Sequence, residues 1–251
     1  MKICKDRPIG KVIYVVEGEK TEVLLLKHIF VEIFSFTFIE SKRNGEDILH
    51  FKSDVNKGSQ VYVIVGKRPQ VVGLTRDASY LEETYNRLNY EFRLEPEEAA
   101  LFYIFDRDRE SNPAGLMRSF IGKLKNSRDN GNDMNGALLI SYPCIESYLV
   151  NAKETEAFHG CGKEIKRYVY RQKYFIENLT EKDLIFATEV LLRFLRRIRN
   201  EDFRFDELDD LSGINSSVFH FEEQKYYKDK VYFTLSLLGL SFLDLGLIAA
   251  E

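Results

Sequence analysis

Apolar residues recur along the first 150 residues in short runs that alternate with segments of helical periodicity. The short runs, rich in β-branched and aromatic residues, predict strands at residues 11–16, 36–39, 61–65, 100–105 and 137–141. The segments between them predict helices at residues 23–33, 78–92, 115–125 and 143–150. Strands that are apolar on both faces and alternate with helices are typical of a parallel sheet covered on both sides. The pattern therefore predicts an α/β fold with a mainly parallel sheet flanked by helices.

Beyond residue 151 the alternation stops and helical periodicity dominates. It predicts helices at residues 163–178, 181–199 and 223–238, with an acidic break over residues 201–211 (EDFRFDELDDL). We therefore expect two parts: an α/β domain over residues 1–150, and a helical C-terminal region over residues 151–251 that packs on it.

Composition and charge narrow the class of protein. The chain has 251 residues, of which 44% are hydrophobic and 13% aromatic, so it can bury a sizeable core. The net charge of −4 argues against wrapping of nucleic acid over the whole surface, but it allows a local basic patch. Charged residues interrupt every apolar run before it reaches membrane-spanning length, and the N-terminus lacks the apolar core of a signal peptide. We expect a cytoplasmic protein with no membrane association.

Acidic residues follow three of the predicted strands. Glu17 follows the first strand in the segment VVEGEKTE, Asp106 and Asp108 follow the strand ALFYIF, and Glu146 comes shortly after ALLIS. In open α/β sheets the functional crevice lies beyond the carboxyl ends of the strands, so these side chains are expected to converge there. Alternation along an extended segment lets both aspartates point the same way while Arg107 points aside.

A cluster of carboxylates raises its own pKa values unless a cation neutralises it, and sites made only of oxygen ligands suit Mg²⁺ or Mn²⁺. The pattern therefore indicates a divalent metal site. Each acid also has a simpler explanation: Glu17, Glu22 and Glu146 can be carboxylates favoured by a helix N-terminus, and the two aspartates can be an N-cap and a solvated turn.

The turn VVEGEKTE after the first strand and FDRDRE after a later hydrophobic strand resemble the glutamate and the DxD pair of the TOPRIM domain. The continuation GEKTE and the later SYPCIESYL resemble RloB-type and overcoming-lysogenization-defect-type nucleases, many of them bacterial anti-phage proteins. The resemblance covers roughly residues 11–150. The separation of 89 residues between Glu17 and Asp106 is long for a compact TOPRIM domain and indicates an insertion at about residues 41–58.

The resemblance implies an enzyme that breaks phosphodiester bonds with one or two Mg²⁺ or Mn²⁺ ions. It implies that Glu17, Asp106 and Asp108 are catalytic, with Glu17 as metal ligand or general acid/base and the aspartates as metal ligands. Glu22 and Glu146 match additional acids of the nuclease subgroup, from which a second metal site could come. Two metals could stabilise the attacking and the leaving oxygen of an in-line displacement.

Basic residues are the candidates for contacts to nucleic acid: Lys67, Arg68, Arg107, Arg193, Arg196 and Arg197. The first two lie in a loop that is as readily explained by solvation. The arginines at 193–197 have an alternative role near a helix C-terminus, where they would pair with the acidic segment 201–210. Tyr168, Tyr170 and Tyr174 could stack on bases, although packing in the core is the commoner role of such aromatic residues.

The sequence thus predicts a metal-dependent nuclease acting on DNA or RNA, as an anti-phage effector within an oligomer or complex. The motif GxxxxGK[ST] does not occur, so ATP-driven control would have to come from a separate ATPase or sensor protein. Two other classes stay open: another metal-dependent phosphotransfer or nucleotide enzyme, and a non-catalytic TOPRIM-like binding subunit. Sugar transferases fit less well, because they do not need the EG turn and the sequence has no second sugar-nucleotide signature. Haloacid-dehalogenase phosphatases fit less well, because their DxDx[TV] motif follows the first strand, whereas FDRDRE is internal and has Glu110 at the last position of the motif.

Overall fold

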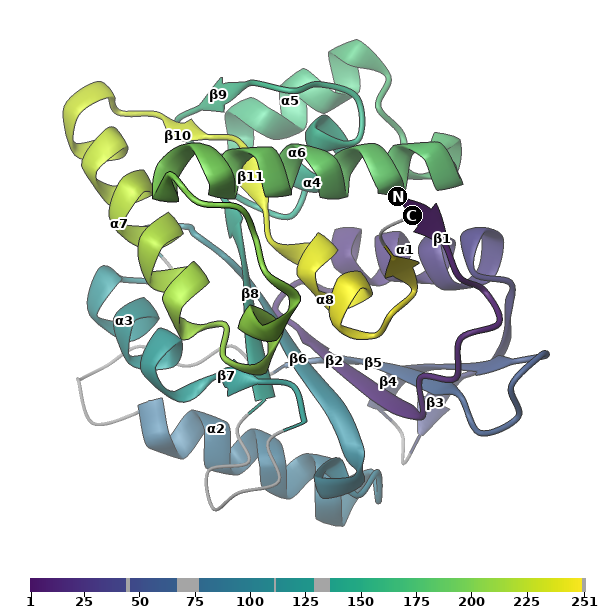
Figure 1. The fold of residues 1–251 in the computed structure, drawn as a ribbon. Helices are drawn as coiled ribbons and strands as arrows, with labels where there is room; N and C mark the ends of the chain where they lie inside the picture. Colours follow the sequence, from purple (N-terminus) through teal and green to yellow (C-terminus); the bar gives the residue numbers. More distant parts are fainter. Residues whose placement is uncertain (44–45, 67–76, 111, 129–135, 250–251) are drawn as a thin grey trace.

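The central feature of the computed structural model is a sheet of eight strands, seven of them in the order β11-β8-β6-β2-β5-β4-β3, with β7 added beside β8 (Figure 1). The structure describes residues 1–43, 46–66, 77–110, 112–128 and 136–249. The four central strands are mutually parallel: β8 Gly136–Tyr142, β6 Ala99–Asp106, β2 Lys11–Val16 and β5 Gln60–Val65. The predicted α/β fold with helices on both sides of the sheet is confirmed, and the arrangement is consistent with a Rossmann-like fold.

Aromatic contacts show which helices cover each face of the sheet. On one face, Tyr14 of β2 stacks on Phe102 of β6 at 5.2 Å between ring centroids and also contacts Phe30. This face is covered by α1 Thr21–His28, its π-helical continuation Ile29–Ile33, and α8 Leu238–Asp244. On the other face, Phe105 packs against Tyr80 of α2 Asp77–Asn86 and Phe120 of α3 Ala114–Lys123. Helices therefore cover both faces of the parallel strands, as their apolar sequences require.

The polar segment that follows the first helix adds an antiparallel hairpin to the sheet. Its strands are β3 Phe36–Arg43 and β4 Glu46–Ser53, and β4 pairs antiparallel with β5. The expected insertion at residues 41–58 therefore overlaps the second half of this hairpin. The hairpin accounts for much of the long separation between the first acidic turn and the second.

The C-terminal region contains the helices α4 Ser147–Asn151, α5 Gly162–Gln172, α6 Glu181–Arg199 and α7 Ser212–Asp229. The prediction for α6 matches its bounds, whereas the helix predicted at 223–238 is wrong. Helix α7 begins eleven residues earlier and ends at Asp229, where Lys230 takes a left-handed conformation with φ of 61°. The chain after it forms short strands instead of helix: β10 Tyr232–Phe233 and β11 Leu235–Ser236.

Short strands tie the end of the chain to its beginning. Strand β11 pairs with β8 of the central sheet, and β12 Ile248–Ala249 pairs with β1 Lys2–Ile3. Figure 1 shows the two termini side by side. The C-terminal region is therefore not purely helical, because it contributes a strand to the central sheet and packs α8 on its face. The remaining short elements are β7 Lys125–Asn126, β9 Phe158–His159 and 3₁₀ turns at Pro96–Glu98, Ile176–Asn178 and Phe205–Asp209.

One acid of α7 lies deep in this packing. Glu222 is fully buried, and its Oε2 accepts a hydrogen bond of 2.9 Å from the backbone N–H of Phe233. Its Oε1 is buried without a hydrogen-bond partner among the described residues. Burial raises the pKa of this carboxyl well above its ordinary value, against the opposing effect of the Phe233 hydrogen bond.

We predict that Glu222→Gln stabilises the protein at neutral pH. A carboxyl whose pKa is raised by folding binds more protons in the folded state, so its contribution to stability is lost as pH rises above the unfolded-state pKa of about 4. The melting temperature of the variant should exceed that of wild type by several degrees at pH 8, and the two should converge near pH 4. Thermal denaturation between pH 4 and 8 checks this, with Glu82→Gln on the exposed side of α2 as the control.

Candidate functional site

A cavity of about 670 Å³ lies beyond the carboxyl ends of the parallel strands. Its walls come from the turn after β2, the start of α1, the end of β6, the segment after β8 and α5. The structure brings all five acidic residues predicted from the sequence to this cavity: Glu17, Glu22, Asp106, Asp108 and Glu146. Parallel pairing explains the convergence, because it places the ends of β2, β6 and β8 at the same edge of the sheet.

The glycine in the acidic turn makes room for a carboxylate. Gly18 donates its backbone N–H to Oε1 of Glu22 at 3.0 Å, which folds the Glu22 side chain back over the turn. A Cβ at position 18 would lie 2.3 Å from Oε2 of Glu22. Glu22 is only 5% exposed although it lies in the first turn of α1. The turn EGEKTE therefore places two carboxylates, not one, on the wall of the cavity.

Glu17 is held by an asparagine that the sequence analysis did not single out. The side-chain amide of Asn112, which is fully buried, donates to Oε2 of Glu17 at 2.9 Å and to the backbone carbonyl of Asp106 at 2.8 Å. The same Glu17 oxygen accepts a longer hydrogen bond of 3.4 Å from the backbone N–H of Asp106. Asn112 thus fixes the end of β6 relative to the turn after β2. No pattern in the sequence marks this role.

Glu146 comes from the segment after β8, and its exposed fraction is only 6%. Its Oε1 accepts a hydrogen bond of 3.0 Å from the hydroxyl of Thr21 and lies 3.6 Å from Nζ of Lys166. Its Oε2 is buried and has no hydrogen-bond partner among the described residues. An ionised carboxylate oxygen in that position is costly unless a donor or a cation reaches it.

The electrostatics of the cavity follow from this crowding. Burial and then repulsion from Glu22, Glu17 and Glu146 raise the pKa of Asp106 well above its usual range. Burial also raises the pKa of Glu22, with further contributions from Glu146 and Glu17. Partial burial opposes the charge of Lys166, but attraction to Glu146 and the neighbouring acids outweighs it and raises the pKa of the Lys166 ammonium. The acids that line the cavity outnumber its cations Lys20, Arg87 and Lys166, so the cavity retains a preference for positive charge.

The carboxylates are not arranged as a closed metal cage. In the ranges that the structure describes, no three Asp, Glu, His or Cys side chains are placed so that they could hold a metal ion as they stand. Protein donors explain this placement, because Glu22 and Asp106 each turn an oxygen toward a backbone N–H, from Gly18 and Ile145 respectively. Binding of a cation would require some of these side chains to rotate toward the centre of the cavity.

The two aspartates after β6 differ in environment. Asp106 lies on the inner wall, and Asp108 is exposed at the rim, where its Oδ1 accepts from the backbone N–H of Glu110 at 3.0 Å. Arg107 points aside, as the alternation predicts, but it does not face nucleic acid. It is 1% exposed, and its guanidinium donates to Glu223 of α7 and to the backbone carbonyl of Asn112. The predicted contact of Arg107 with nucleic acid is therefore wrong, because Glu223 neutralises the Arg107 guanidinium within the fold.

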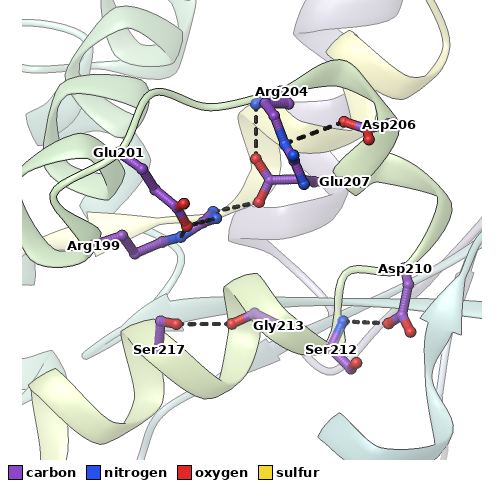
Figure 2. A network of polar contacts seen from close by, with 9 residues as sticks. All are labelled: Arg199, Glu201, Arg204, Asp206, Glu207, Asp210, Ser212, Gly213 and Ser217. Carbon is purple, nitrogen blue, oxygen red and sulfur yellow. Dashed lines mark hydrogen bonds and ion pairs between the residues drawn. The ribbon is translucent and has the colours of Figure 1, made fainter.

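The arginines at the end of α6 pair largely with the acidic segment after it. Arg196 lies 3.2 Å from Asp202, and Arg199 contacts both Glu201 and Glu207. Figure 2 shows the contacts of Arg199 with Glu201 and Glu207, together with the Arg204–Glu207 and Arg204–Asp206 contacts. Arg197 instead pairs with Glu156 at 3.0 Å. The alternative of helix-end pairing is confirmed for Arg196 and Arg199.

Three other basic candidates have different outcomes. Arg193 donates to the backbone carbonyl of Glu189 at 3.2 Å and packs over the ring of Phe186, so it lies along its own helix. Lys67 and Arg68 lie outside the described residues. Contact with nucleic acid stays a prediction for Arg193 and for the exposed part of Arg197.

The three tyrosines in α5 and directly after it also differ in their environment. Tyr168 and Tyr174 both donate their hydroxyls to Oε1 of Glu154, at 2.7 and 2.8 Å, which is a structural role. Tyr170 is 74% exposed.

Comparisons with known proteins give little more. No family model matches the chain, and no curated protein matches it. Among solved structures, the chain is similar to the crystal structure of a hypothetical protein from Pyrococcus horikoshii OT3, with 16% sequence identity and a TM-score of 0.33. The match covers 88% of this chain and 91% of that one. Within the described ranges, none of the helices is both long and apolar enough to cross a membrane.

We predict that Asn112→Ala lowers the free energy of unfolding by about 1–3 kcal/mol, because it leaves the Asp106 carbonyl and a Glu17 oxygen without their buried donor. Urea denaturation checks this. Asn178→Ala, at an exposed position, is the matched control and should change stability by less than about 0.5 kcal/mol. Equal stability of both variants would contradict the role assigned to Asn112.

Proposed function

We propose that the protein is a metal-dependent phosphodiesterase of the TOPRIM type that cleaves DNA or RNA. The observation that carries the proposal is the convergence of Glu17, Glu22, Asp106 and Glu146 at the carboxyl ends of three parallel strands, where burial and then repulsion between the acids raise the pKa of Asp106 and of Glu22. Selection would not maintain such a repulsive arrangement for stability, because each uncompensated buried acid destabilises the fold. A bound divalent cation removes that cost.

The residues fit a Mg²⁺ or Mn²⁺ ion by their chemistry. All candidate ligands are oxygens, which these hard cations prefer, and the buried Oε2 of Glu146 lacks the partner that a cation would supply. Glu17, Asp106 and Asp108 would hold one ion, and Glu22 and Glu146 would contribute to a second. When bound, the metal supplies a nucleophile at neutral pH and stabilises charge on the phosphoryl oxygens.

The chain's own residues position these groups. Asn112 fixes the rotamer of Glu17 through its Oε2, and Gly18 fixes Glu22 through its Oε1. Lys166 lies at the cavity wall with its side chain 60% exposed, so its ammonium can orient a substrate phosphate that enters from solvent. The protein thus holds acids on the inner wall of the cavity and the solvent-exposed ammonium of Lys166 beside them.

The wider role follows the same proposal. We propose that the protein acts in the cytoplasm as an anti-phage effector, within an oligomer or a complex with a separate ATPase or sensor. The absence of a P-loop motif supports an external source of ATP-driven control. If a partner activates the enzyme, cleavage by the purified chain should be slower than cleavage by the reconstituted complex.

A second candidate is a non-catalytic binding subunit with the same fold. It is favoured by the finding that no three of the described acidic, histidine or cysteine side chains form a preformed metal cage. In that case Lys166 and the backbone donors would be the final partners of the carboxylates.

The first prediction of the proposed function concerns cleavage. Wild type should cleave at least one of supercoiled plasmid, single-stranded DNA and tRNA in Mg²⁺ or Mn²⁺, and chelator should abolish the activity. Asp106→Asn and Glu17→Gln should each lower the rate by at least about 100-fold, the loss typical of removing one group that stabilises charge in the transition state. Asp202→Asn, an acid with a 77% exposed side chain on the α6–α7 connection, is the matched control and should retain activity.

Calorimetry with Mg²⁺ separates the two candidates. If no substrate is cleaved but Mg²⁺ binds wild type and not Asp106→Asn, the metal site is supported and an activating partner is required. If wild type binds no Mg²⁺ and cleaves nothing, the enzymatic proposal fails and the binding subunit is favoured.

The second prediction tests the glycine of the acidic turn. Gly18→Ala would place a Cβ against the Glu22 carboxylate and displace it, so Mg²⁺ affinity should fall about 10- to 100-fold, as for other residues that orient metal ligands. Gly213→Ala on α7 is the control, because a Cβ there meets no atom within 4 Å. Equal Mg²⁺ affinity of the two variants would show that Glu22 does not contribute to the metal site.

A further inference from the structure

A second cavity, of about 530 Å³, opens beside the carboxylate cavity and differs from it in chemistry. It lies between α1 on one side and α5 with the following 3₁₀ turn on the other. Apolar and aromatic side chains dominate its walls: Leu24, Val31, Leu149, Val169, Tyr170 and Phe175. We call it the α1–α5 groove.

The groove is continuous with the acidic cavity. Thr21, Glu146 and Lys166 line both, so one wall separates the carboxylates from the apolar space. Lys166 and Tyr170 are four residues apart on α5 and therefore project from the same face of that helix, one turn apart. A ligand that reaches from one cavity to the other would pass Lys166 and then meet Tyr170.

The rim of the groove exposes apolar surface that the fold itself does not use. Tyr170 is 74% exposed and Leu24 is 55% exposed, and they lie on opposite sides of the groove. The Tyr170 ring is supported by Phe175, whose ring centre lies 6.4 Å away at an interplanar angle of 67°. An exposed, edge-supported aromatic ring beside an apolar groove is suited to stack on a planar ligand.

We propose that the α1–α5 groove binds the unpaired base of the nucleotide next to the scissile phosphate, so that the enzyme acts on single-stranded nucleic acid. The proposal rests on the function proposed above and names its substrate class. The phosphate lies in the acidic cavity, Lys166 contacts the phosphate, and Tyr170 stacks on the base.

The geometry excludes a fully paired duplex from this arrangement. A base within a duplex is stacked on both faces and paired at its edge, so it cannot enter a groove without being unstacked at a cost of a few kcal/mol. A single strand presents its base without that cost. Lys27, His28, Glu32 and Glu177 also line the groove. Stacking on an aromatic ring is tolerant of base identity, so selectivity among bases should be weak.

Direct binding provides the test, because it does not depend on cleavage. Wild type and variants are titrated in Ca²⁺ with a short single-stranded oligonucleotide that contains the fluorescent base 2-aminopurine, and with the same sequence as a duplex. Wild type should bind the single strand at least 10-fold more tightly than the duplex, and binding should quench the fluorescence as the base stacks. Tyr170→Ala should weaken binding roughly 5- to 100-fold, as for other base-stacking residues, and Tyr170→Phe should restore it.

The control is Tyr227→Ala on α7. Tyr227 is 85% exposed and lines neither cavity, so its removal should leave binding and quenching unchanged. Where cleavage is measurable, Tyr170→Ala should raise KM for the single strand.

Each outcome separates the groove from the metal site. If Tyr170→Ala binds the single strand as wild type does while Asp106→Asn abolishes Mg²⁺ binding, the groove proposal is overturned and the proposed function stands. If Mg²⁺ does not bind but Tyr170→Ala still weakens binding of the single strand, the base-binding groove stands and the nuclease proposal fails. If Tyr170→Ala instead changes only the molar mass in light scattering, the groove is a protein interface and the base-binding proposal is wrong.

Discussion

Backbone pairing of three parallel strands forces carboxylates together at one edge of the sheet. Val16 of β2 pairs with Ile104 of β6, and Asp106 of β6 pairs with Ser141 of β8. The residues that follow these strands therefore lie next to one another at the same edge of the sheet. Burial and then the resulting repulsion raise the pKa of Asp106 well above its ordinary value. The arrangement of donors around the cavity is a response to that repulsion.

The protein moderates the repulsion without removing it. Four groups each donate a hydrogen bond to one carboxylate oxygen: the Asn112 amide, the backbone N–H groups of Gly18 and Ile145, and the Thr21 hydroxyl. Lys166 supplies a positive charge beside Glu146. One oxygen of Glu146 is still left without a donor in the described structure. Because the carboxylates are stabilised only in part, a cation or a charged ligand that binds there can stabilise them further. This incomplete compensation is what connects the fold to a proposed chemistry.

The basic residues show the opposite behaviour. Arg107 is adjacent to both Asp106 and Asp108 in the sequence, yet α7 buries it and Glu223 pairs with it. Near the end of α6 the acidic connection turns back and pairs with Arg196 and Arg199. Local charge density therefore misled for Arg107, whose charge is neutralised by an element that is distant in the sequence. The partners of Arg196 and Arg199 lie in the acidic segment that the sequence itself indicated. Arg107 and Glu223 lie 116 residues apart.

The sequence alone determined the α/β class, the central strands, the bounds of α6 and the convergence of four acidic residues, Glu17, Asp106, Asp108 and Glu146. These follow from local apolar periodicity and from the rule that parallel strands end at one edge, which needs no knowledge of distant contacts. Only the tertiary structure decided the third C-terminal helix, the strand that residues 235–236 add to the sheet, the role of Asn112, and the α1–α5 groove. Each of these depends on packing between segments far apart in the chain, and such packing leaves no periodic signal in the residues themselves.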